Sequence, residues 1–247
     1  MSGDDSALLA AQAEASRIAQ CAPRTLAVDA VLFDLDGTLA DTAPDLIAAL
    51  NRVRAEHGRD PLPAVHLRPY ASQGARGMLG AGMGASPEDP GFPALRDSFL
   101  DHYAAALCVH SVLFPGAAAL LRAIEARALR WGIVTNKATR FTNPLLDALQ
   151  LSARANAVVC GDTTPHAKPH PAPLLFAAER MGVAPERCVY VGDAERDILA
   201  GVAAGMPTIV ARYGYIDPRE APHDWPADGM IEDPMALLCW LPVRAGI

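Results

Sequence analysis

The sequence predicts an α/β fold in which a doubly wound parallel sheet carries an inserted all-helical domain. Two observations support this prediction. Short apolar runs alternate with stretches of helical periodicity through much of the chain, as expected for parallel strands joined by crossover helices. The alternation stops between residues 43 and 112, where helical stretches are joined by loops rich in proline and glycine and no strand is evident.

Each predicted strand is a short run rich in Val, Leu, Ile or aromatic residues. The first covers residues 27–34 (AVDAVLFD) and ends where Asp and Gly favour a turn. Similar runs follow at residues 131–135, 157–160, 188–192 and 208–211. Helical patterns lie between them, at residues 116–128, 140–149, 171–181 and 195–204. Because helices connect successive strands, the sheet is expected to be parallel.

The interruption divides the chain into two predicted domains. Residues 26–42 and 113–247 are expected to form the α/β core domain, and residues 43–112 the helical insert. Helices of the insert are expected near residues 45–56, 74–82 and 94–107. Residues 1–25 are rich in Ala and are expected to be an N-terminal leader, helical or disordered.

The composition argues against several classes of protein. The 247 residues include 21 Lys and Arg against 28 Asp and Glu, a formal charge of −7, so no broad basic surface for nucleic acid or an anionic membrane is expected. The N-terminus is acidic, and no apolar stretch reaches the ~20 residues of a bilayer span. The five cysteines include no CxxC pair, which is typical of a reducing compartment. We therefore expect a cytoplasmic monomer or small homo-oligomer.

Lysine is rare in this chain. Lys137 and Lys168 are the two lysines, so 19 of the 21 basic residues are arginine. An ammonium is a compact point charge, whereas a guanidinium is a planar fork. Since arginine serves almost everywhere else, the two lysines are candidates for positions that need the compact cation.

The most specific motif stands at the end of the first predicted strand, where residues 34–38 read Asp-Leu-Asp-Gly-Thr. Side chains two residues apart point the same way on an extended strand, so Asp34 and Asp36 are expected to project together. They do so at the carboxyl edge of the sheet, where doubly wound folds bind ligands. Turn chemistry alone does not explain two acids that leave a buried strand together.

Polar residues also follow the later strands. Thr135 and Asn136 end the second predicted strand, Lys168 lies in a proline-stiffened loop after the third, and Asp193 and Asp197 follow the fourth. The spacing of four places Asp193 and Asp197 on one face of a helix that has begun by then. For the Thr-Asn pair and the aspartate pair taken alone, a helix cap is an equally good interpretation.

Together, the strand ends would bring four carboxylates into one crevice. Two carboxylates 4 Å apart repel by roughly 4 kcal/mol at an effective dielectric of about 20. A bound divalent cation removes this cost, and an all-oxygen ligand set without a His or Cys cluster favours Mg²⁺ over zinc. The pattern therefore indicates a site for phosphate and Mg²⁺.

In their order along the chain, the motifs DxDGT, Thr-Asn, Lys-Pro and GDxxxD resemble those of the haloacid dehalogenase superfamily of phosphohydrolases, over about residues 27–240. The resemblance implies a Rossmann-like core with a helical cap domain, Mg²⁺ as cofactor, and a small-molecule phosphate ester as substrate. It implies that Asp34 is the nucleophile that accepts the phosphoryl group. It also implies that Asp36 protonates the leaving oxygen and then activates water.

The resemblance assigns the other core residues to two tasks. Phosphate oxygens would be held by Thr135, Asn136, Lys168 and the backbone amides near Leu35 and Gly37. The metal would be bound by Asp34, the backbone carbonyl of Asp36, Asp193 and, directly or through water, Asp197. Lys137 follows the second motif but is not one of the catalytic positions of the family.

The helical insert corresponds to the cap of the superfamily, which closes over the site and recognises the part of the substrate that is not phosphate. Within it, residues 72–77 (SQGARG) form a loop of small residues with one cation. Related caps carry specificity residues at this place, so the resemblance makes Gln73, Gly74 and Arg76 candidate specificity residues. Arg76 is suited to a bidentate contact with a substrate carboxylate.

The segments DLDGTLADTAPDL and ARYGYI look most like those of the phosphoglycolate phosphatase group, which implies 2-phosphoglycolate as the substrate. The related N-acetylmuramic acid 6-phosphate phosphatases share the segments VTNK, RF and ARYGYI and provide the alternative. Both substrates bear a carboxylate, so Arg76 does not discriminate between them. A β-phosphoglucomutase-like enzyme and a non-catalytic sensor of phosphorylated ligands would keep the same core.

Overall fold

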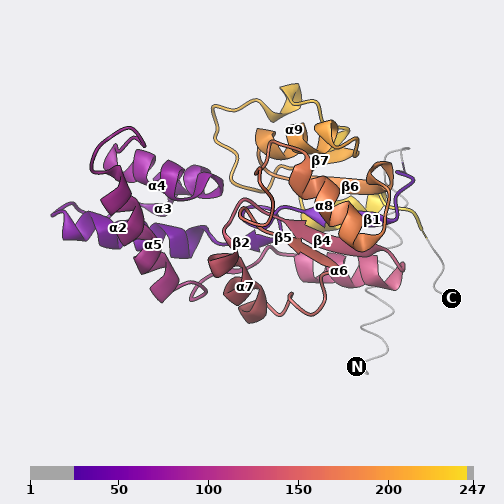
Figure 1. Ribbon diagram of the computed structural model, residues 1–247, viewed down its shortest axis with the longest axis horizontal. Helices are drawn as coiled ribbons and strands as arrows, with labels where there is room; N and C mark the ends of the chain where they lie inside the picture. Colours follow the sequence, from indigo (N-terminus) through magenta and orange to yellow (C-terminus); the bar gives the residue numbers. More distant parts are fainter. Residues whose placement is uncertain (1–24, 244–247) are drawn as a thin grey trace, which may run out of the picture.

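The computed structural model describes residues 25–243, which form a six-stranded parallel sheet with helices on both faces and a helical lobe beside it (Figure 1). The strand order is β5-β4-β1-β6-β7-β8. The strands are β1 (Ala30–Phe33), β4 (Arg130–Val134), β5 (Ala157–Val159), β6 (Cys188–Gly192), β7 (Thr208–Ala211) and β8 (Gly229–Ile231). Since β1 lies between β4 and β6, the residues that follow β1 lie in the middle of the sheet's carboxyl edge, between the loops that follow those two strands. The predicted fold class is confirmed.

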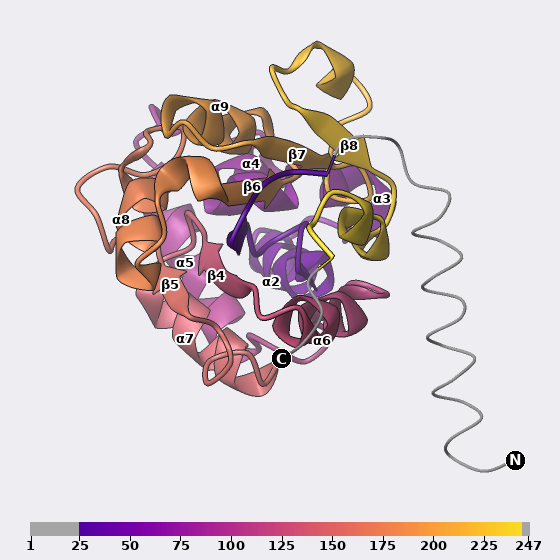
Figure 2. The ribbon, with the colours of Figure 1, turned by 90° about the vertical axis from the view of Figure 1, so that its right-hand side faces the viewer.

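Helices α8 and α9 cover one face of the sheet, and α6 and α7 lie on the other side (Figure 2). Their bounds are α6 (Ala117–Ala126), α7 (Thr139–Ala148), α8 (Ala172–Met181) and α9 (Glu195–Ala203). On β1, Leu32 packs in the cluster of α8 and α9, and Phe33 in the cluster of α6 and α7. Alternate residues of a strand face opposite sides, so a sheet covered twice needs apolar residues at every position. This explains the continuous apolar runs.

The lobe beside the sheet consists of short helices (Figure 1). They are α2 (Ala43–Glu56), α3 (Ala64–Leu67), the 3₁₀ helix η1 (Arg68–Gln73), α4 (Gly74–Met83) and α5 (Phe92–Ala105). Buried apolar side chains hold α2 against α4 and α5, among them Leu50, Met78 and Phe99. Helix α4 is capped by Gly84, which adopts a left-handed conformation that favours glycine.

Two short strands mark the points where the chain leaves the core and returns to it. Strands β2 (Ala40–Asp41) and β3 (Val112–Leu113) pair in antiparallel fashion. The buried Asp45 carboxylate, in the first turn of α2, accepts the backbone N–H groups of residues 109–111 at 2.9–3.1 Å. The outgoing and returning segments are therefore bonded to each other.

Tyr215 ties the outgoing segment to the core. Its hydroxyl accepts the N–H groups of Thr42 and Ala43 at 2.7 and 2.9 Å and donates to Asp41 Oδ1 at 2.8 Å. The backbone N–H of Tyr215 donates to Asp193 Oδ2 at 2.8 Å. Through Tyr215, the ARYGYI segment thus connects the start of the lobe with the Asp193 carboxylate of the GDxxxD motif.

The five predicted strands are present, with bounds that differ by a few residues. Strand β8 and the β2–β3 pair were not predicted: β2 and β3 have two residues each, and β8 (Gly-Met-Ile) holds one β-branched residue between acidic flanks, whereas the equally short β5 is marked by its Val-Val pair. The other 3₁₀ helices are η2 (Pro185–Arg187), η3 (Pro222–Asp224) and η4 (Pro234–Cys239). The leader predicted for residues 1–25 lies, except for its last residue, outside the described residues. Within residues 25–243, no helix is both long and apolar enough to span a bilayer.

Candidate active site

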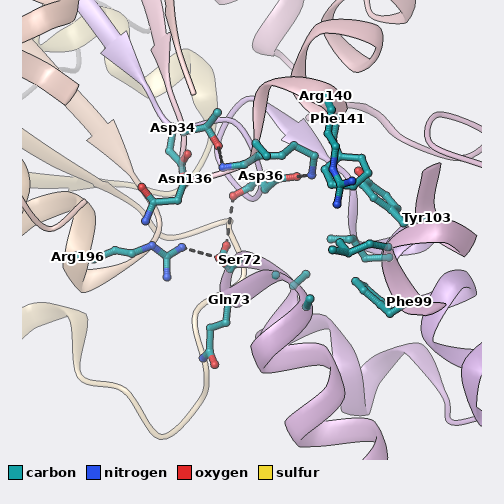
Figure 3. Close-up of a pocket in the computed structure, with 18 residues that line it drawn as sticks. Asp34, Asp36, Ser72, Gln73, Phe99, Tyr103, Asn136, Arg140, Phe141 and Arg196 are labelled. Carbon is teal, nitrogen blue, oxygen red and sulfur yellow. Dashed lines mark hydrogen bonds and ion pairs between the residues drawn. The ribbon is translucent and has the colours of Figure 1, made fainter. Parts of the chain in front are cut away.

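Asp34 and Asp36 follow β1 and line one cavity (Figure 3). The Asp34 carboxylate is almost fully buried, and its Oδ1 accepts the N–H of Leu35 at 2.7 Å. Gly37 has a φ of +87°, and a Cβ at this position would collide with the Asp193 carboxylate. The glycine of the motif is therefore required both by its backbone conformation and by the close approach of two loops.

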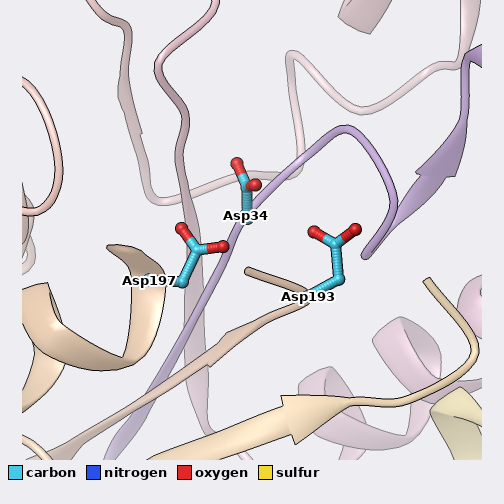
Figure 4. A group of neighbouring side chains, drawn as sticks. All are labelled: Asp34, Asp193 and Asp197. Atoms are coloured by element: carbon cyan, nitrogen blue, oxygen red, sulfur yellow. The ribbon is translucent and has the colours of Figure 1, made fainter. Parts of the chain in front are cut away.

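Three carboxylates form a cluster (Figure 4). Asp34, Asp193 and Asp197 each place one oxygen within 4.8 Å of the others, and all three are buried. Asp34 and Asp193 follow the adjacent strands β1 and β6, and Asp197 lies in the first turn of α9. Three carboxylate oxygens at this separation fit a hard divalent cation, which prefers oxygen ligands.

The protonation of these carboxylates responds to their burial. Burial, opposed by Lys168, raises the pKa of Asp34 to about 6. Burial, followed by the charges of Asp34 and Asp197, raises the pKa of Asp193 to about 7. Ionised forms are thus costly in the cluster unless a further cation compensates them. This supports a role in binding a metal ion.

Lys168 is the buried cation beside Asp34. Its Nζ lies 3.0 Å from Asp34 Oδ1 and 2.7 Å from Asp197 Oδ1. The ammonium also donates to the Val134 carbonyl at 2.8 Å and to the Tyr190 hydroxyl at 2.6 Å. Four oxygen atoms surround the ammonium, so its position is fixed.

Asn136 holds the loop that carries Lys168. Its Nδ2 donates to the Lys168 carbonyl at 2.9 Å, and its Oδ1 accepts the Lys168 N–H at 3.0 Å. Nδ2 carries a second N–H, so the contact with phosphate that the resemblance implied can form while both of these bonds persist. The neighbouring Thr135 Oγ1 accepts the N–H of Lys137 at 3.1 Å, which leaves the hydroxyl proton for another acceptor.

Two backbone amides expected to face phosphate are engaged within the loop after β1. The Leu35 N–H donates to Asp34 Oδ1, and the Gly37 N–H donates to the Ala40 carbonyl at 3.0 Å. A phosphate oxygen would have to replace these acceptors. We expect the Leu35 N–H to change its acceptor more easily than the Gly37 N–H does, because its present acceptor is the Asp34 carboxylate, the proposed nucleophile.

Asp36 has a cation of its own. Lys137 Nζ lies 2.8 Å from Asp36 Oδ1, and the Thr42 hydroxyl donates to the same oxygen. The ring of Tyr103, from α5, lies 4.8 Å from Lys137 Nζ, within the range of a cation–π contact. Burial by itself would lower the pKa of Lys137, but Asp36 and Tyr103 raise it, so the ammonium stays charged.

One side chain of the lobe reaches the carboxylate cluster. Ser72 Oγ donates to Asp193 Oδ2 at 2.9 Å and lies 3.2 Å from the Asp36 carbonyl. Arg196, on α9, donates from Nη2 to the Ser72 carbonyl at 2.7 Å. Its Nε is buried without a hydrogen-bond partner among residues 25–243. Neither residue was predicted to belong to the site, although Ser72 begins the SQGARG segment, because their meeting depends on how the lobe docks.

The cavity of about 320 Å³ lies between the core and the lobe (Figure 3). Its core wall is polar and includes Asp34, Asp36, Thr135, Asn136, Lys137, Arg140 and Arg196. Its apolar wall includes Leu46, Ala71, Phe99, Leu100, Tyr103 and Phe141. A ligand with one anionic end and a larger, partly apolar remainder would match both walls.

The predicted specificity residues of the lobe are only partly at the cavity. Gln73 and Gly74 line it, whereas Arg76 is exposed and is not among the lining residues. The two lining arginines are Arg140 and Arg196, both from the core. With 19 arginines in the chain, the sequence offers no way to choose these two.

The comparisons with known proteins agree with this geometry. A sequence model of the family described as haloacid dehalogenase-like hydrolase matches residues 31–211. The chain is 42% identical over 215 residues to an N-acetylmuramic acid 6-phosphate phosphatase of Pseudomonas aeruginosa, covering 87% of this chain and 95% of that protein. It is 44% identical over 213 residues to a phosphoglycolate phosphatase of Xanthomonas campestris pv. campestris, covering 86% and 95%.

A solved structure shares the fold. The structure of a predicted phosphoglycolate phosphatase from Haemophilus somnus gives a TM-score of 0.74 at 26% identity, covering 85% of this chain and 96% of that chain. The family match spans β1 to β7 and therefore includes the inserted lobe and all three carboxylates of the cluster.

Proposed function

Because the chain belongs to the haloacid dehalogenase-like hydrolases, we propose that it is a Mg²⁺-dependent phosphomonoester hydrolase that forms a phosphoryl-Asp34 intermediate. One observation carries the proposal. The buried Asp34 carboxylate lies at the polar wall of the cavity, 3.0 Å from the Lys168 ammonium and beside two further carboxylates. A carboxylate attacks an anionic phosphate only where positive charge offsets their repulsion, and here Lys168 together with a cation held by the carboxylate cluster would supply that charge.

The metal ligands in this proposal are Asp34, the backbone carbonyl of Asp36, Asp193 and, directly or through water, Asp197. When bound, Mg²⁺ neutralises charge on the phosphate and on the carboxylates. Tyr215 and Ser72 both donate to Asp193 Oδ2 and so orient that carboxylate.

The chain supplies the nucleophile and the acid–base group. An Asp34 oxygen attacks phosphorus, and the bond from phosphorus to the leaving oxygen breaks. Asp36 gives its proton to that oxygen, so the alcohol leaves neutral. Asp36, now a carboxylate, takes a proton from a water molecule that attacks the phosphorus. The bond to Asp34 then breaks, releasing inorganic phosphate and the free enzyme.

The remaining core residues hold the phosphate and the nucleophile. Lys168 orients Asp34 and adds positive charge, and the Thr135 hydroxyl donates to a phosphate oxygen. The Leu35 amide exchanges Asp34 Oδ1 for a phosphate oxygen, and Gly37 permits the approach of the Asp193 loop. We assign Asn136 the task of fixing the Lys168 loop.

For the substrate we favour N-acetylmuramic acid 6-phosphate over 2-phosphoglycolate, the reverse of the order expected from the sequence. Ligand pockets for drug-sized molecules span about 300–1,000 Å³. A cavity of about 320 Å³ therefore suits a sugar phosphate, and a two-carbon acid would leave most of it unfilled. The buried, unpartnered Nε of Arg196 and the nearby Arg140 are the groups we assign to the substrate carboxylate, in place of Arg76.

The deciding experiment measures kcat/KM for both substrates in parallel with saturating Mg²⁺. We expect the sugar phosphate to be favoured by at least about tenfold, the discrimination available from apolar contacts alone. Preference for 2-phosphoglycolate, the name carried by the Xanthomonas relative, would restore that substrate to first place.

The hydrolase proposal itself is tested with p-nitrophenyl phosphate. We expect phosphate release that depends on Mg²⁺ and stops on addition of EDTA. Absence of release from all three substrates would contradict the proposal and favour a non-catalytic sensor. Transfer of phosphate to a sugar instead of water would favour a mutase.

A further inference from the structure

Both lysines of this chain lie in the candidate active site, and each contacts a different aspartate. Lys168 lies 3.0 Å from Asp34, and Lys137 lies 2.8 Å from Asp36. The other 19 basic residues are all arginine. A lysine retained at two such positions indicates that a compact ammonium is needed at both. The proposed function accounts for Lys168 and leaves Lys137 without a task.

The contacts of Asp36 show what Lys137 can do. Lys137 and Thr42 both donate to Oδ1 of Asp36. Among the described side chains, both donors to this carboxylate therefore bind the same oxygen. None of these contacts uses Oδ2, so that oxygen is available for proton transfer. Two donors on one oxygen fix the rotation of the carboxylate, which an acid–base group needs in order to meet the leaving oxygen and later the water.

The main chain of Lys137 is itself held in place. Its N–H donates to Thr135 Oγ1 at 3.1 Å, and its carbonyl accepts the Gly161 N–H at 2.9 Å and the Thr142 hydroxyl at 3.2 Å. The side chain is 9% exposed. An ammonium that starts from a rigid backbone and is enclosed by protein holds its partner more tightly than a mobile surface lysine does.

The lobe completes this enclosure. Tyr103 of α5 places its ring 4.8 Å from Lys137 Nζ and is itself buried. The ammonium therefore lies between a catalytic carboxylate of the core and an aromatic ring of the lobe. Its position depends on the lobe being docked.

We propose that Lys137 is the positioning residue of Asp36, and that Tyr103 secures this position when the lobe covers the site. This inference rests on the proposed function, in which Asp36 protonates the leaving oxygen. It predicts that loss of Lys137 impairs esters whose leaving group needs a proton more than esters whose leaving group does not.

The test compares phenyl phosphate with p-nitrophenyl phosphate. The two esters are similar in size, but p-nitrophenolate leaves readily without protonation. The value of kcat/KM reports the steps through departure of the leaving group, so the ratio of p-nitrophenyl to phenyl phosphate measures acid assistance. For Lys137→Met we expect this ratio to rise by about tenfold or more, out of the 10²- to 10⁴-fold that acid–base catalysis provides. Tyr103→Leu should raise it by less, and Tyr103→Phe, which keeps the ring, should leave it near the wild-type value.

Asp36→Asn provides the reference. By itself it should raise the ratio at least as much as Lys137→Met does. In the Asp36→Asn background, Lys137→Met should change the ratio no further. The two substitutions impair the same function, proton donation by Asp36, which is already lost in that background. A further rise in the double variant would mean that Lys137 acts independently of Asp36 and would overturn the inference.

Other outcomes also decide. If Lys137 bound phosphate or had only a structural role, kcat/KM would fall equally for both esters and the ratio would not change. Lys137→Arg keeps the buried charge and is measured beside Lys137→Met in case the latter does not fold. Because a planar fork cannot replace the compact ammonium here, it should raise the ratio about threefold. An unchanged ratio in a folded Lys137→Arg variant would contradict the inference. Inactive wild-type protein, or a wild-type ratio in Asp36→Asn, would refute the proposed function instead.

Discussion

The two walls of the cavity receive their residues in different ways. Asp34, Thr135 and Asp193 each follow a strand of one parallel sheet, so the sheet brings them to the same edge whatever else the chain does. Ser72 and Tyr103 lie on helices of the lobe and reach the site only because the lobe docks against the core. The groups proposed for the chemistry therefore rest on the sheet, and the lobe residues that enclose the site rest on an interface, whereas the arginines proposed for the substrate carboxylate come from core helices.

The largest effect should follow from a change in the core wall. Asp34→Asn removes the proposed nucleophile, and we expect kcat to fall by about 10⁴-fold or more, measured with p-nitrophenyl phosphate. The fold should persist, since burial makes the ionised Asp34 costly and the amide has a similar shape. Thermal melting checks this second point. Appreciable turnover in a single-turnover assay would refute the nucleophile assignment.

A second variant separates close approach from backbone strain. Gly37→Ala places a Cβ against the Asp193 carboxylate, and we expect kcat/KM to fall by about 100-fold and the free energy of unfolding by about 1–3 kcal/mol. Gly84→Ala is the matched control in the lobe, because Gly84 also has a positive φ, +69°, but has open space around it. It should cost about 1 kcal/mol of stability and leave activity within about twofold. Similar activity losses in both variants would mean that strain alone explains Gly37.

The arginines test which wall recognises the substrate carboxylate. Arg196→Ala should lower kcat/KM for N-acetylmuramic acid 6-phosphate by about tenfold, because a charge-assisted contact and the bond to Ser72 are lost. Arg76→Ala should change it by less than about twofold, since its side chain is exposed away from the cavity. The opposite result would return specificity to the loop suggested by the sequence.

The smallest expected effect is a pH dependence of metal stabilisation. The raised pKa values of Asp34, about 6, and Asp193, about 7, mean that the folded state binds protons more tightly than the unfolded state, where an aspartate has a pKa of about 3.9. Without metal, the stability that the folded state gains from protonated Asp34 and Asp193 is lost as pH rises from about 4 to 7. Mg²⁺ binds the ionised carboxylates, so we expect it to raise Tm by a few degrees at pH 8 and by less at pH 5.

Melting curves in EDTA and in Mg²⁺ across this pH range measure that difference. Asp193→Asn should abolish most of the gain from Mg²⁺ at pH 8 and should not lower Tm in EDTA. A gain equal at both pH values would contradict the assignment of the cluster as the metal site.

Most of the core was predictable because its signals are local. The apolar run that ends in Asp-Leu-Asp-Gly-Thr predicts both a strand and the chemistry at its carboxyl end. The parallel sheet then brings motifs that are distant in the sequence to the same edge. Strands β2 and β3 have two residues each and β8 holds a single β-branched residue, so none of them forms the apolar run that marked the other strands. The three longer helices of the lobe were predicted, but not the short α3 and η1 or the direction in which each helix faces.

Lys137 shows where local signals end. Its rarity marked it, yet neither its spacing nor the family resemblance gave it a task, because its partners Asp36 and Tyr103 lie on other segments of the chain. Arg76 shows the reverse: the loop composition favoured it, and the structure leaves it exposed.

The sequence by itself determined the alternating fold and the aspartates at its strand ends, since these follow from periodicity and from motifs read within a few residues. Only the tertiary structure decided which side chains of the lobe and which arginines enter the cavity, because that depends on how the lobe packs against the core, with which it shares one hydrophobic cluster.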